Sequence, residues 1–213
     1  MDAPMDTQIT PAELPVETPR LRMTEEEFVA WCDEDTKAEW VDGEVIVHSP
    51  ANLQHVDLAG FLQIIVRLFA TQRDLGVVYG PELQIRLGSL RRRRVPDLLF
   101  IAKERMSIIK ATEVEGAPDL IIEIVSPDSP ARDWREKYLE YEAASVREYW
   151  VIDPMAQRVE GYALGVDGRY TLLAEKDGVI HSTALTGFFL KPAWLWQEPL
   201  PNPLDVLKEL GVL

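Results

Sequence analysis

Two short apolar runs, each containing one acid, constrain the fold of this chain most. The run Val95–Ile101 carries Asp97, and the run Ile121–Val125 carries Glu123 at its centre. Runs this short and this apolar are typical of strands that are buried on both faces of a sheet. A carboxylate in such a strand is costly unless it is paired, hydrogen-bonded or bound to a metal ion. The two runs therefore predict a buried sheet that contains a polar site.

The remaining pattern places helices beside this sheet. A capping box at Thr24 predicts a short helix, and Asp42-Gly43 predicts a two-residue hairpin turn. Apolar residues recur at helical spacing from Leu53 to Ala70, which predicts an amphipathic helix. Ser129-Pro130 is typical of a helix start, with the helix continuing to about Ala144. Three strand-like segments then predict an antiparallel β meander toward the C-terminus, at 158–164, 169–174 and 179–182, and a short helix begins near Pro203. This order predicts an α/β fold with helices on the faces of the sheet.

Length and composition predict one domain in a reducing compartment. The chain of 213 residues is long enough for one well-cored domain, which we place at residues 20–213. Residues 1–19 are acidic and proline-spaced, so we expect a flexible tail, not a signal peptide. Cys32 is the single cysteine, which excludes an intrachain disulfide. No apolar run approaches the length of a membrane span, so we expect a cytoplasmic protein that does not contact membranes.

The net charge limits how this chain could contact nucleic acid. A formal charge of −14 is the opposite of a broad basic face, so any contact with DNA must be local. The run Arg91, Arg92, Arg93 and Arg94 concentrates positive charge in one place. We interpret it either as a solvated loop or as a local DNA contact.

The two strand acids predict a metal site. Mg²⁺ takes one or two carboxylates together with water and substrate phosphate, so Asp97 and Glu123 on neighbouring strands would suit it. Asp119 is the rival of Asp97, because both follow a proline. Four residues along a strand separate Asp119 from Glu123 by about 13 Å, too far to share one ion. We expect Asp119 to begin the strand and to face solvent.

A lysine lies on the inward stripe of the helix that follows. Lys137 shares its helical face with three aromatic residues, Trp134, Tyr138 and Tyr141. An inward-facing lysine needs an anionic partner, and two carboxylates or a phosphate would provide one. The alternative is a lysine that lays its stem on the core and extends its ammonium group to solvent.

Several separated motifs agree in order with one known family. They are Val95-Pro96-Asp97, the segment 118–127, the segment 132–141 and the segment 148–154. These motifs resemble the Uma-two family of predicted restriction endonucleases, which is part of the PD-(D/E)xK nuclease superfamily. The segment Glu39 to Pro50 also looks like the N-terminal signature of that family, so the resemblance covers roughly residues 20 to 190.

The resemblance implies a restriction-endonuclease-like core, in which helices flank a mixed central β-sheet and Asp97 and Glu123 hold Mg²⁺ or Mn²⁺. In the superfamily pattern a lysine stands two residues after the second acid, where this chain has Val125. Members of the resembled family look as though this lysine has moved to the following helix, which makes Lys137 the third catalytic residue.

Two further residues are candidates for the same site. Glu44 follows the hairpin turn, and similar nucleases sometimes recruit a third carboxylate from this part of the chain. As an alternating strand residue, Glu44 could equally lie on the surface. His55, near the start of the long helix, could belong to the site or could be a helix cap or packing residue.

Three hypotheses about function follow. The first is an active endonuclease that hydrolyses DNA phosphodiester bonds, with a metal ion activating water. The second is a catalytically inactive binding or regulatory module with a nuclease fold. The third is a metal-free structural or oligomerisation protein, based on the cluster Trp194-Leu195-Trp196, which is more simply core or subunit interface. A homodimer would suit cleavage of both DNA strands.

Overall fold

The computed structural model describes residues 21–33, 36–48, 51–126 and 132–213, without the side chains of 132–134. The α-helices are α1 (Glu25–Trp31), α2 (Leu53–Gln72), α3 (Tyr138–Ala143), α4 (Pro192–Leu195) and α5 (Pro203–Glu209). The first strands are β1 (Ala38–Val41), β2 (Glu44–Val47), β3 (Gly76–Tyr79), β4 (Gln84–Leu87), β5 (Arg92–Arg94), β6 (Leu98–Ala102) and β7 (Glu113–Glu115). The later strands are β8 (Leu120–Ile124), β9 (Glu148–Asp153), β10 (Arg158–Leu164), β11 (Tyr170–Leu172), β12 (Ile180–His181) and β13 (Phe189–Leu190). Short 3₁₀ turns lie at η1 (Gly88–Leu90) and η2 (Lys103–Ile108), and η3 (Arg132–Lys137) is π-helical. The predicted tail at residues 1–19 and the predicted helix start at Ser129-Pro130 lie outside the described residues.

A six-stranded mixed sheet forms the centre of the molecule. Its strand order is β11-β10-β9-β8-β6-β3, and β8 and β9 are parallel while the other neighbours are antiparallel. The two apolar runs of the sequence form β6 and β8, which are adjacent and fully buried. The α/β fold with a mixed sheet and flanking helices is therefore confirmed, as is the antiparallel β structure toward the C-terminus.

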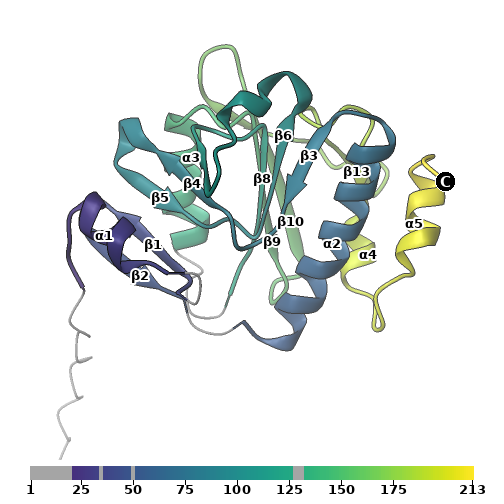
Figure 1. Cartoon of the computed structure of the whole chain (residues 1–213). Coiled ribbons are helices and arrows are strands. Elements are labelled where there is room, and N and C mark those ends of the chain that lie inside the picture. The colour runs from purple at the N-terminus through teal and green to yellow at the C-terminus, as the bar shows by residue number, and fades with distance from the viewer. Residues whose placement is uncertain (1–20, 34–35, 49–50, 127–131) are drawn as a thin grey trace, which may run out of the picture.

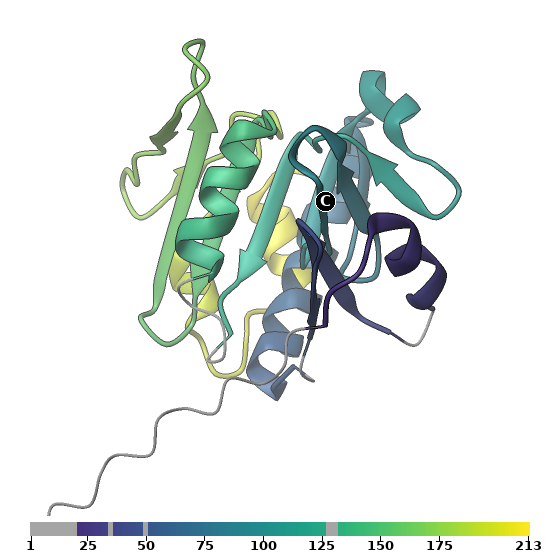
Figure 2. The ribbon, with the colours of Figure 1, turned by 90° about the vertical axis from the view of Figure 1, so that its left-hand side faces the viewer.

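Helices and a second sheet cover the two faces of this central sheet (Figures 1 and 2). One face of the sheet is covered by α2, α4 and α5. The alternate side chains Leu120, Ile122 and Ile124 of β8 share a hydrophobic core with these helices. On the other face, Ile121 and Val125 join a separate core with α3 and β4. Glu123 lies between Ile121 and Val125 in the strand and shares their face, so it points toward α3.

The second sheet has five strands, in the order β2-β1-β5-β4-β7. The β1–β2 hairpin turns at Asp42-Gly43 as predicted, and both residues adopt the positive φ that the turn requires. The capping box predicted at Thr24 is present, and the helix it starts places Phe28 in a small core with Trp40. The chain passes from this sheet to the central sheet through Val95-Pro96-Asp97, between β5 and β6.

Three details differ from the sequence-based expectation. The strand predicted at 179–182 does not extend the meander, because β12 pairs with β13 in a separate two-stranded sheet. The segment Arg132–Lys137 is π-helical, so the expected α-helix is regular only from Tyr138. Finally, α2 is long and apolar enough to cross a membrane by length and composition alone, although no such apolar run was expected. Seven of its residues are buried in the core, as in the central helix of many soluble proteins.

Candidate active site

Asp97 and Glu123 lie side by side at one end of the central sheet. Leu98 pairs with Ile122 across the antiparallel β6–β8 ladder, so continuing the register by one residue places Asp97 opposite Glu123. The backbone N–H of Ile124 donates a hydrogen bond of 2.8 Å to Asp97 Oδ2. Opposed residues in a sheet have Cβ atoms about 5 Å apart, so these two carboxylates can act on the same bound group.

His55 fixes the second oxygen of Asp97. Its Nε2 lies 3.1 Å from Asp97 Oδ1, and the helix start at Asn52, whose side chain caps the His55 N–H, sets its position. Burial alone would raise the pKa of Asp97, but the hydrogen bond and charge of His55, the charge of Lys137 and the Ile124 N–H together hold that pKa below its usual value. Asp97 is therefore an ionised carboxylate although it is 8% exposed.

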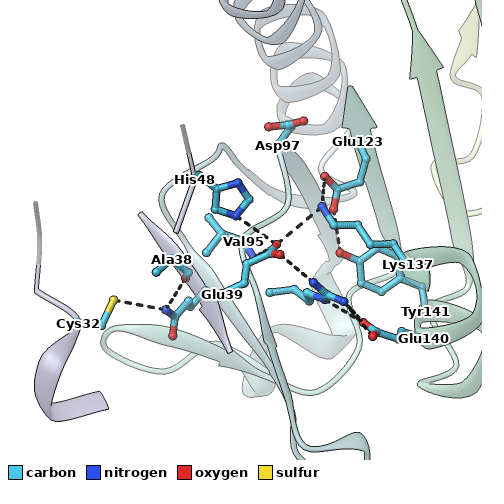
Figure 3. Close-up of polar contacts among 12 residues, drawn as sticks. Cys32, Ala38, Glu39, His48, Val95, Asp97, Glu123, Lys137, Glu140 and Tyr141 are labelled. Carbon is cyan, nitrogen blue, oxygen red and sulfur yellow. Dashed lines mark hydrogen bonds and ion pairs between the residues drawn. The ribbon is translucent and has the colours of Figure 1, made fainter. Parts of the chain in front are cut away.

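Glu123 is held from the side of the following helix. Lys137 Nζ lies 2.8 Å from Glu123 Oε2, and the Tyr141 hydroxyl donates a 2.8 Å hydrogen bond to Oε1. Figure 3 shows both side chains reaching Glu123 from the same helix. Lys137 is 2% exposed, so its ammonium group points inward and does not extend to solvent. Burial, and then the charge of Glu123, raise the pKa of Tyr141 well above its ordinary value, so its hydroxyl remains a donor.

A further buried acid, Glu39 of β1, joins this cluster from the second sheet. Its Oε1 lies 3.7 Å from Lys137 Nζ and accepts a 3.2 Å hydrogen bond from the Val95 N–H, while Oε2 accepts from Arg94 Nη1 at 2.8 Å. His48 Nε2 also faces Oε1, at 3.6 Å. Burial would raise the pKa of Glu39, but Lys137 and Arg94 outweigh it and hold that pKa well below the usual value.

Sequence reasoning did not identify Glu39 as a site residue. Glu39 lies between the apolar residues Ala38 and Trp40, a pattern typical of a strand with its polar side chains in solvent. It is nevertheless 0% exposed, because α1 covers one face of β1 and the cluster covers the other. The available signal was the resemblance of the segment 39–50 to a family signature, since that segment begins at Glu39.

Three residues of the arginine run, Arg92–Arg94, form β5, which lies between β1 and β4 in the second sheet. Arg93 and Arg94 are buried there, so for these two residues the structure supports neither a solvated loop nor an exposed DNA contact. Arg94 is 0% exposed and donates to Glu39 and to both oxygens of Glu140. Burial would lower the pKa of Arg94, but these two carboxylates raise it above its ordinary value. The guanidinium group of Arg94 is therefore charged, and each of its three nitrogens donates a hydrogen bond inside the fold.

The other three arginines differ in their exposure. Arg93 is buried and pairs with Glu25 and Glu113, so the expectation that it contacts DNA is wrong, as it is for Arg94. Arg92 is partly buried and pairs with Glu140 at 2.9 Å. Arg91 is the exposed member, 3.4 Å from Asp42. An arginine that is paired with a carboxylate inside the fold does not present its charge to a DNA phosphate.

Two further acids from the sequence analysis are Glu44 and Asp119. Glu44 begins β2 opposite Val41, two positions along the strand from the Glu39–Ile46 pair, or about 7 Å. The role predicted for Glu44 stays a prediction. Asp119 directly precedes β8, but it is 0% exposed and does not face solvent as expected, because Arg105 and Arg147 bind its Oδ1 at 2.8 and 2.9 Å.

The cluster is a small site rich in carboxylates, with the ammonium group of Lys137 beside them. Asp97 and Glu123 present carboxylate oxygens from adjacent strands, and Lys137 places an ammonium group beside them. Oxygen ligands of this kind suit hard divalent cations. Within the described ranges no three His, Cys, Asp or Glu side chains form a metal cage by themselves. A cation here would therefore keep positions open for water and for a phosphate.

Comparisons with known proteins identify the family and the fold. The model of the Uma2 family, described as "Putative restriction endonuclease", matches residues 25–193. A crystal structure from Anabaena variabilis ATCC 29413, described as "a putative nuclease belonging to DUF820", is similar with a TM-score of 0.68 at 20% sequence identity. The similarity covers 82% of this chain and 97% of that one, and at this identity it concerns the fold alone. No curated protein matches the sequence.

Proposed function

Because this chain belongs to the Uma2 family, we propose that it is a divalent-metal-dependent endonuclease that hydrolyses DNA phosphodiester bonds. One observation carries the proposal: Asp97 and Glu123 lie on adjacent strands, with Lys137 Nζ 2.8 Å from Glu123. The family description supports a nuclease, and the fold of the Anabaena variabilis protein is compatible with one. We infer the metal and the roles of individual residues from the side chains, and the DNA substrate from the family.

The donor set fits Mg²⁺ or Mn²⁺. Asp97 and Glu123 each contribute a carboxylate whose oxygens have further acceptor capacity beyond the hydrogen bonds they already make. Mg²⁺ typically binds through one or two carboxylates and completes its shell with water and substrate phosphate. A bound ion of this kind supplies an activated water and neutralises charge on the phosphate.

Protein residues hold the Asp97 carboxylate and place a positive charge beside the proposed cation site. His55 and the Ile124 N–H hold the two oxygens of Asp97, so its carboxylate cannot rotate freely. Lys137 provides a positive charge within the same buried space, where an ion pair acts in a lower dielectric than in water. We assign to Lys137 the stabilisation of charge on the scissile phosphate, and to Asp97 and Glu123 the holding of the cation.

The substrate must approach a protein of net charge −14. Since Arg93 and Arg94 are internal, attraction to DNA rests on the site itself and on exposed cations such as Arg91. Binding should therefore be weak and strongly dependent on the divalent ion. We keep the homodimer as a prediction, because two sites would serve the two strands of a duplex.

Cleavage assays test the proposal directly. Plasmid and single-stranded DNA are incubated with Mg²⁺ or Mn²⁺ and wild type, Asp97→Asn, Glu123→Gln or Lys137→Met. We expect each substitution to lower the cleavage rate about 100-fold or more, because each removes a charge from the reacting centre. Asp119→Asn, which changes the buried acid at the other end of β8, is the matched control and should keep the wild-type rate in its folded fraction.

Two results would change the assignment. Equal cleavage by wild type and all three variants would show that this cluster is not the reacting centre. An inert wild type whose Mn²⁺ affinity depends on both Asp97 and Glu123 would instead favour a binding module with a nuclease fold.

A further inference from the structure

Lys137 lies between two carboxylates that come from different sheets. Its Nζ is 2.8 Å from Glu123 Oε2 in the central sheet and 3.7 Å from Glu39 Oε1 in the second sheet. Figure 3 shows the ammonium group at the point where these two side chains converge. The shorter distance is a charge-assisted hydrogen bond, and the longer one is an ion pair that needs about 1 Å of movement to become one.

The Glu39 carboxylate is fixed without help from Lys137. Arg94 binds Oε2 at 2.8 Å, and the Val95 N–H binds Oε1 at 3.2 Å. Both partners belong to β5 or directly follow it, and β5 pairs with β1 beside Glu39. Glu39 therefore offers a preformed, negatively charged position next to the ammonium group.

A divalent cation at Glu123 would conflict with the position that Lys137 now occupies. Both positive charges would share one carboxylate, and two like charges a few ångströms apart repel strongly in a buried site. The ammonium group of lysine is a compact charge on a flexible stem, so a small change in the side-chain torsions can bring it to a nearby anion. Glu39 Oε1 is such an anion, on the side of Lys137 away from β8.

We propose that Glu39 is a positioning residue that takes over the Lys137 ammonium group when a divalent cation occupies Asp97 and Glu123. The inference rests on the proposed function, since it requires a cation at those two acids. Glu39 would then lower the competition between lysine and metal, and would hold Lys137 charged at the edge of the metal site. A direct ligand role for Glu39 is less consistent with the contacts, because Arg94, Val95 and Lys137 already surround its two oxygens.

Mn²⁺ binding without DNA tests this role by isothermal titration calorimetry. Four proteins are compared: wild type, Glu39→Gln, Lys137→Met and the double variant. We expect Glu39→Gln to weaken Mn²⁺ binding about tenfold, the equivalent of one charge-assisted hydrogen bond. In the Lys137→Met background the same substitution should change the affinity less than about twofold, because there is no ammonium group left to place.

Two controls separate this effect from charge and folding. Glu140→Gln removes a carboxylate that pairs with Arg92 and Arg94, and it should leave the Mn²⁺ affinity within about twofold of wild type. Lys137→Met keeps the Glu39–Arg94 pair intact, so it remains informative if Glu39→Gln does not fold. This variant should bind Mn²⁺ about tenfold more tightly than wild type, because the competitor is gone.

Each contrary result has a distinct meaning. Equal losses from Glu39→Gln with and without Lys137 would overturn the positioning role and would leave the proposed function standing. Unchanged or weaker Mn²⁺ binding by Lys137→Met would also overturn it. If Mn²⁺ binding to wild type does not depend on Asp97, as measured with Asp97→Asn, both the proposed function and this inference fail.

Discussion

Replacing Arg94 by methionine should destabilise the fold strongly, whatever its effect on DNA. Arg94 is 0% exposed and donates hydrogen bonds of 2.8 Å to Glu39 and Glu140. Breaking one side of a buried ion pair costs about 3–5 kcal/mol, because the remaining charge is buried without compensation. Here Glu140 keeps Arg92 and Glu39 keeps Lys137, so we expect the lower part of this range, ~3 kcal/mol.

Urea denaturation followed by circular dichroism measures this loss. A decrease of ~3 kcal/mol in the free energy of unfolding corresponds to a fall in Tm of roughly 6–12 °C for a chain of this size. The matched control is Arg91→Met, the exposed neighbour in the same run, which should change stability by less than about 0.5 kcal/mol. Equal and small effects of the two substitutions on stability, with equal losses of DNA affinity, would refute the internal role of Arg94.

Three further predictions concern the same structure. Glu39 has a folded-state pKa well below its ordinary value, so its ionisation stabilises the fold above about pH 4.5, and this contribution is lost as the pH falls below that value. Urea denaturation between about pH 3 and 6 should therefore show a free energy of unfolding that depends less steeply on pH in Glu39→Gln than in wild type. An equal dependence in the two proteins would contradict this. Tyr141→Phe removes the buried hydrogen bond to Glu123 and should lower the free energy of unfolding by about 1.5–3 kcal/mol, measured by the same denaturation; a loss below about 0.5 kcal/mol would mean that the bond does not form. Thr24→Ala removes half of the capping box with Glu27 and should cost about 1 kcal/mol, whereas Thr24→Ser should cost little; equal stability of the two variants would argue against the cap.

Local patterns predicted most of the elements because each has a local physical cause. Asp42-Gly43 fixes the β1–β2 hairpin, since few other residue pairs tolerate positive φ at both turn positions. The dense apolar run at 121–125 predicted a strand buried on both faces, and β8 is such a strand with Glu123 buried in it. The strand β12 was less predictable, because its pairing with β13 depends on a partner that carries almost no strand pattern.

The site was only partly predictable, since its partners are distant in the sequence. Arg94 binds Glu39 and Glu140, which are 55 and 46 residues away, so no window of sequence shows that the arginine run is neutralised. The expectation that Asp119 faces solvent was wrong for the same reason. Its partners Arg105 and Arg147 come close to it only in the folded chain. Burial of charged side chains is decided by tertiary pairing, which local periodicity does not record.

The position of Lys137 on a helix has a consequence for how such proteins diverge. A lysine two residues after Glu123 would be tied to it by the rigid spacing of one strand. Lys137 is instead joined to Glu123 through space, so the number of residues between the acid and the lysine can vary among relatives as long as the helix docks in the same place. Position 125 then does not need a lysine, and Val125 is buried in the apolar core there. A comparison of the spacing of charged residues in the sequence would overlook this pairing of Glu123 with Lys137, whereas a comparison of the atoms around Glu123 in the structure would find it.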